Sequence, residues 1–183
     1  MRKILISTLT LLAFTVTSIP YASADDMATS TPATAVLSDG ESAEVMVTLN
    51  EGEIELGQLA KRKANNKQVK DYAKMMVDQH KQNEKDTKRV VRKQDLNFKK
   101  TDMSKSLEAQ VIDMEKTLKK TTKDDFDRAY MGQQVTLHEK ALDTVNSLIG
   151  SAQNAAYKVH LEKTRDAITV HLAHAKEINS MIE

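Results

Sequence analysis

The chain has 183 residues, enough for one domain with a hydrophobic core, and a formal net charge of +1 from 27 basic and 26 acidic side chains. So balanced a charge argues against nucleic acid as a partner, because phosphate backbones are bound by a surplus of Lys and Arg. The sequence has no cysteine, which excludes disulfides, thiolate chemistry, iron–sulfur clusters and cysteine-ligated zinc.

The first 24 residues have the three parts of a secretory signal peptide. Arg2 and Lys3 are basic, residues 4–19 are mostly apolar, and the Ala-Ser-Ala at 22–24 is a small-residue cleavage site. We expect cleavage after Ala24, which sends the mature protein to the periplasm or outside the cell with no stable membrane anchor. A membrane span is the alternative, but the apolar run is short for one.

The rest of the chain has the composition of a helical protein. Residues 25–38 are rich in small residues and contain Pro32, so we expect a disordered linker there. From residue 33 onward the sequence has no proline, and Lys, Glu, Ala, Leu, Met and Gln are frequent. This composition favours long helices and predicts an all-α, up-and-down bundle over residues 39–183.

Capping signals divide this region into four long helices and one shorter helix. The turn Asn65-Asn66 is so short that the first two helices must lie antiparallel and adjacent. Gly52 and Gly57 indicate either a close approach by a neighbouring helix or merely tolerated glycines. The expected caps are Ser38, Asn65, Thr121 or Thr122, Gly150 and Ser151, and the expected helices span about residues 39–64, 66–94, 104–119, 121–149 and 151–182.

Each long helix carries on its apolar stripe one residue able to bind a metal: Glu53, His80, His138 and His171. At a rise of ~1.5 Å per residue, Glu53 lies ~18 Å and His80 ~22 Å from the first turn, so the two belong to one layer. Measured from the second turn, His171 lies ~10 Å deeper than His138. We therefore expect two or three of these side chains to meet, rather than all four. His160 and His174 are expected at the surface or its boundary.

Two interpretations of these residues stay open. A histidine on an apolar stripe is often a hydrogen-bonded core residue, and Glu53 with His80 would form such a pair. Alternatively, imidazole and carboxylate ligands suit a single transition metal, namely zinc, iron, copper or manganese. A dinuclear iron site is not expected, because the sequence has no Glu-x-x-His. It also has no Gly-x-Ser-x-Gly and no phosphate-binding loop, so we predict no catalytic residue and favour a non-enzymatic role over an enzymatic one.

Four segments, in this order and spacing, resemble an exported bacterial family: EIELGQLA at 53–60, VKDYAKMMVDQH at 69–80, FDRAYM at 126–131 and HLAHA at 171–175. This family is domain of unknown function 4142, which is placed in the ferritin-like superfamily. The resemblance implies a ferritin-like four-helix bundle with an extra short helix in the central connection. It also implies a periplasmic or secreted protein of a Gram-negative bacterium, without a known activity. The family's usual positions correspond to Glu53, His80, His138 and His171.

Three functions follow as hypotheses. The first is a non-enzymatic periplasmic protein with a structural or partner-binding role, acting as a homo-oligomer or with a periplasmic protein partner. The second is a metal-binding or metal-sensing bundle that uses Glu53 and the stripe histidines. The third and weakest is a ferritin-like oxidoreductase, since the superfamily's iron ligands do not transfer to this sequence.

Overall fold

The computed structural model describes residues 36–182, which form five α-helices and, within that range, no strand. The helices are α1 (Asp39–Lys63), α2 (Lys67–Lys93), α3 (Asp102–Lys120), α4 (Phe126–Ser151) and α5 (Ala155–Ile182). The predicted all-α class is therefore confirmed. The predicted signal peptide (1–24) and residues 25–35 of the predicted linker lie outside the described residues.

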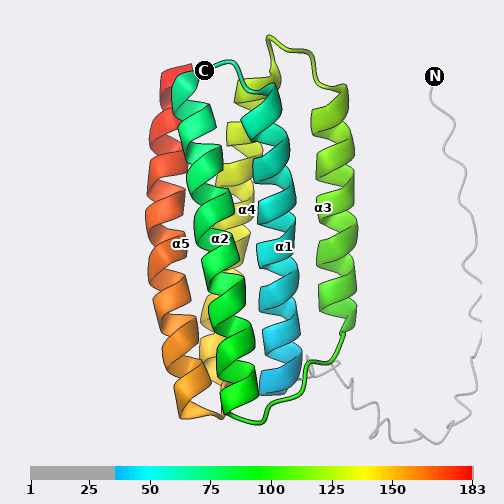
Figure 1. Ribbon diagram of the computed structural model, residues 1–183, viewed down its shortest axis with the longest axis vertical. Helices are drawn as coiled ribbons and strands as arrows, with labels where there is room; N and C mark the ends of the chain where they lie inside the picture. Colours follow the sequence, from blue (N-terminus) through cyan, green and yellow to red (C-terminus); the bar gives the residue numbers. More distant parts are fainter. Residues whose placement is uncertain (1–35, 183) are drawn as a thin grey trace, which may run out of the picture. The chain divides into compact units, whose positions relative to one another are not determined.

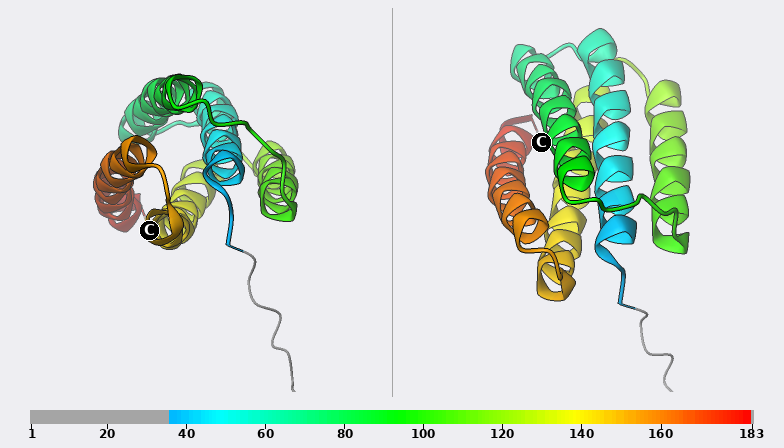
Figure 2. Two further views of the ribbon diagram at one scale, coloured as in Figure 1. Left: turned by 90° about the horizontal axis from the view of Figure 1, so that it is seen from below. Right: turned by 60° about the horizontal axis from the view of Figure 1, so that its bottom comes forward.

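Each helix runs antiparallel to the one before it, so α2 and α4 point the same way (Figure 1). The most extensive contacts join α1 to α2 and α4 to α5, and α2 also packs beside α5. Figure 2 shows α3 outside this group of four long helices, lying along α1. No helix between residues 36 and 182 has the length and apolarity needed to cross a membrane.

The core consists of two apolar clusters with a polar layer between them. One cluster surrounds Tyr72, Phe126 and Tyr130, and the other surrounds Tyr157 and Leu161. Along each long helix the buried residues change from one cluster to the other across a short polar stretch. The buried polar residues of these stretches are Asn50, Glu53, His80, Thr87, Gln134, His138 and His171.

Two aspartates tie the helical hairpins to each other at opposite ends. Asp39, the first residue of α1, accepts from the backbone N–H groups of Gln153 and Asn154 at 3.1 and 2.7 Å, in the turn before α5. Asp127, near the start of α4, accepts in the same way from the N–H groups of the turn before α2. Each carboxylate also lies at the positive N-terminal end of its own helix, which stabilises the charge.

The N-terminal caps of the first hairpin are partly as expected. Ser38 and Glu41 form the predicted capping box at the start of α1. The predicted cap at Asn65 is wrong, because Asn66 Oδ1 accepts from Gln68 N at 2.7 Å. The backbone N–H of Asn65 is instead bonded to Asp127.

The boundaries of the second hairpin differ more from the prediction. Thr122 Oγ1 bonds to Asp125 as expected, but only in the turn before α4, which begins at Phe126. No glycine among the described residues has a positive φ, and α4 continues through Gly150 to Ser151. The last helix begins four residues later than the predicted cap at Ser151, after Asn154 Oδ1 accepts from Tyr157 N at 3.0 Å.

Gly52 lets α3 approach α1 closely. A Cβ atom at this position would lie 2.5 Å from Val111 Cγ2 of α3, which is closer than real contacts allow. The close-approach interpretation of Gly52 is therefore confirmed.

His160 is buried, which corrects the prediction that it lies at the surface. Its Nε2 is 2.8 Å from Thr87 Oγ1 on α2, and its side chain is 8% exposed. His174 is half-buried, and its ring contacts the edge of Tyr72 with a centroid distance of 5.5 Å.

We predict that Asp127→Ala lowers the free energy of unfolding by about 1–2 kcal/mol, because two backbone N–H groups lose a charged acceptor. Urea denaturation followed by circular dichroism measures the change. Asp124→Ala is the matched control: it changes an exposed aspartate three residues earlier, in the turn just before α4, and should leave the midpoint unchanged. Equal midpoints for the two variants would contradict a tie between the hairpins.

We also predict that His160→Gln weakens the pH dependence of stability. Burial lowers the pKa of His160, with Lys163 and Arg89 acting in the same direction and Asp86 opposing them. As the pH falls, His160 is therefore protonated in the unfolded chain before it is protonated in the folded protein. This favours the unfolded state, so the free energy of unfolding decreases below about pH 6.5. Unfolding free energies at pH 7.5 and 5.5, measured with a chelator present, should differ less in the variant than in the wild type. An unchanged difference would contradict the lowered pKa.

Candidate metal centre

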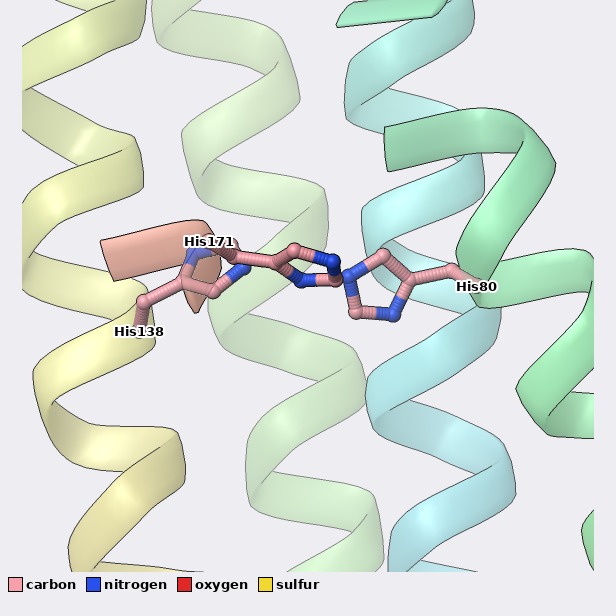
Figure 3. A group of neighbouring side chains, drawn as sticks. All are labelled: His80, His138 and His171. Atoms are coloured by element: carbon pink, nitrogen blue, oxygen red, sulfur yellow. The ribbon is translucent and has the colours of Figure 1, made fainter. Parts of the chain in front are cut away.

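Three histidines from three helices meet in the polar layer. His80 on α2, His138 on α4 and His171 on α5 point their rings toward one another (Figure 3). Their ring centroids are 5.3–5.8 Å apart, and one ligating nitrogen from each lies within 4.8 Å of the other two. All three are buried, with exposed fractions of 8%, 1% and 3%.

One ring nitrogen of each histidine is held by an oxygen acceptor. His80 Nδ1 is 2.9 Å from Asn50 Oδ1, and His138 Nδ1 is 2.9 Å from the carbonyl of Gln134. His171 Nε2 is 2.5 Å from Gln79 Oε1. Since these oxygens only accept, the ring nitrogens donate, and this fixes the tautomer of each neutral ring.

The other nitrogen of each ring is buried without a hydrogen-bond partner. These atoms are His80 Nε2, His138 Nε2 and His171 Nδ1. A buried polar atom left unpaired costs about 1–3 kcal/mol, so three in one layer are a large local cost. The tautomers place a lone pair on each of these nitrogens, which is the form that binds a metal.

The surroundings of His80 and His171 keep these two rings neutral. Burial lowers the pKa of His80 well below its ordinary value, and the neighbouring His138 and His171 act in the same direction. Burial, with His138 and His174, lowers the pKa of His171 to about 4. At neutral pH both imidazoles are therefore uncharged and able to act as ligands.

Glu53 lies beside the three histidines rather than among them. Its Oε1 is 3.7 Å from His138 Nδ1, and its Oε2 accepts from Gln134 Nε2 at 3.0 Å. A carboxylate behind a ligating histidine orients the ring and makes it more basic. Glu53 and Asp39 are the buried carboxylates of residues 36–182, and Asp39 lies at the end of the bundle, bonded to the turn between α4 and α5. The described core therefore holds no set of carboxylates able to bridge two irons.

The structure thus brings the three predicted histidines together, with Glu53 adjacent. The predicted ~10 Å offset between His138 and His171 is too large, because α5 begins at Ala155. His171 lies 16 residues into α5 and His138 lies 13 residues before the end of α4, an offset of only ~5 Å.

The residues that orient the rings were not identified from the sequence. Asn50 and Gln134 lie on the buried faces of their helices, and Gln134 precedes His138 by one turn. A side-chain amide on the apolar stripe, one helical turn from a candidate ligand, is the sequence pattern that could have identified both residues. Gln79 carried no such signal, since it is exposed and simply adjacent to His80.

Three neutral imidazoles are a ligand set for zinc, copper, iron or nickel. Nitrogens bound to one tetrahedral zinc are about 3.3 Å apart, so small ring movements would close the present group around an ion. Three protein ligands also leave one coordination position open.

Comparison with known proteins gives a family and no function. No curated protein and no solved structure matches the chain. The model of one family, described as Domain of unknown function (DUF4142), matches residues 23–178. Because this match covers most of the sequence, the chain belongs to the DUF4142 family.

Proposed function

We propose that this protein binds one divalent transition-metal ion through His80, His138 and His171. The observation that carries the proposal is the set of three buried, partnerless ring nitrogens that face one another. An ion would satisfy all three at once, while each opposite nitrogen already has its acceptor.

The chemistry of the donor set supports one ion rather than two. Imidazoles oriented by amides and a carboxylate are the arrangement found around protein-bound zinc and related ions. Glu53 supplies a negative charge that offsets part of the ion's charge. Within the described residues the group has no exposed member, so the ion would be held in the core rather than on the surface.

The setting of this activity is also part of the proposal. The signal-peptide pattern of residues 1–24 supports export to the periplasm, where the protein would hold or sense a metal without catalysing a reaction. The parallel course of α2 and α4, with α3 between them in the chain, supports a ferritin-like bundle.

A structural or partner-binding role is the second candidate. Three exposed apolar side chains on α3 and the segment before it favour this role: Phe98, Met103 and Ile112. It predicts that metal content has no influence on the protein's function.

We predict about one metal ion per chain in protein purified without chelators or an affinity tag, measured by elemental mass spectrometry. His80→Gln should weaken metal binding by about 100-fold, because it removes one of three ligands. His160→Gln is the matched control, since it alters a buried histidine outside the group, and it should keep the metal. A wild-type protein that stays metal-free after incubation with zinc, iron, copper and manganese would refute the proposal.

We also predict that Gln79→Ala weakens zinc affinity by about tenfold while the protein stays folded, because His171 loses the acceptor that fixes its tautomer. A competition titration against a chromogenic chelator measures the affinity. Gln82→Ala changes a second exposed glutamine of α2, bonded to Asp86 rather than to a histidine. Equal affinities for both variants would show that Gln79 does not orient a ligand.

A further inference from the structure

A cavity of about 240 Å³ adjoins the three histidines. His80, His138 and His171 are part of its lining, and half of the other lining residues are apolar. For scale, benzene occupies an engineered apolar cavity of about 150 Å³. The space beside the histidines is therefore large enough for a small organic molecule.

The cavity is connected to solvent along α2. Gln79 and Gln82 are exposed, and both belong to its lining. On the inner side Met46, Val111 and Ile168 provide an apolar wall from α1, α3 and α5. A ligand entering between the glutamines would have the histidines and an apolar wall around it.

Charge decides which class of molecule fits. A divalent ion bound by three neutral imidazoles keeps its double charge, and the buried Glu53 offsets one unit. The other carboxylate of the lining, Asp86, is already paired with Arg89 at 2.6 Å. Among the described lining residues there is no lysine and no arginine. One positive charge thus remains, and it is located on the metal.

We propose that this cavity binds a small monoanion with a compact apolar body. The anionic donor atom would take the open coordination position of the metal, and the body would lie against the apolar wall. This inference rests on the metal binding proposed above and adds the class of ligand. It also makes ligand binding dependent on the metal, because the lining offers no other cation.

Cobalt(II)-loaded protein tests the proposal, since the visible spectrum of cobalt reports changes in its coordination. Benzoate is the test ligand. Benzamide is the control that has a similar apolar body without the charge, and formate is the control that has the charge without the apolar body. We expect benzoate to change the spectrum and to bind at least about tenfold more tightly than either. Benzoate should have no measurable affinity for the metal-free protein.

Ala167→Leu provides the structural test, because Ala167 lines the cavity on α5 and its methyl side chain is not a metal ligand. The larger side chain should lower benzoate affinity by about tenfold or more while cobalt binding is retained. Ala173→Leu makes the same change at an exposed position of α5 and should bind benzoate as the wild type does. Ala141→Leu fills the cavity from α4 and replaces Ala167→Leu if that variant does not fold.

The outcomes separate the two proposals. A protein that does not bind cobalt would overturn the metal site itself. Cobalt-loaded protein whose spectrum benzoate leaves unchanged, or that binds formate as tightly as benzoate, would overturn the cavity proposal alone. Equal benzoate affinity in the wild type and in a folded cavity-filling variant would overturn it as well.

Discussion

A layer of buried polar side chains between two apolar clusters is the feature on which the rest of this structure depends. Polar groups removed from water must find partners, or the fold loses stability. Asn50 illustrates the solution. Its side-chain NH₂ group donates to the carbonyl of Met46 and to Asn83 Oδ1, and its Oδ1 accepts a hydrogen bond from His80 Nδ1. The layer thus fixes ring orientations, and leaves three nitrogens facing one another.

The site belongs to the whole bundle rather than to a local motif. Asn50 of α1 orients a histidine of α2, and Gln79 of α2 orients a histidine of α5. Correct axial register is essential, because a slip of one helical turn is about 5.4 Å. That distance exceeds the 4.8 Å within which the ligating nitrogens now lie. The carboxylates of Asp39 and Asp127, each bound to the turn of the other hairpin, help to fix this register.

The short helix α3, which lies outside the four long helices, provides no candidate ligand but helps to form the cavity wall. It packs mainly on α1, where Gly52 leaves room for Val111. Val111 in turn reaches the lining of the cavity beside the histidines. Without the glycine, α3 would have to stand further from α1, and the wall of the cavity would change. A residue with no side chain thereby influences the space next to the candidate metal centre.

The sequence by itself determined the helices, their apolar stripes and the one candidate ligand on each long helix. These properties depend on local propensity and on the 3.6-residue period, both of which can be read from the chain. Only the tertiary structure decided which ligands meet, because their axial alignment depends on where each helix begins. The capping signals placed the starts of α4 and α5 several residues too early. It also decided the tautomers, since Asn50, Gln79 and Gln134 become partners of the histidines only after folding. Burial of His160 was likewise decided there, because its partner Thr87 lies 73 residues away in the sequence.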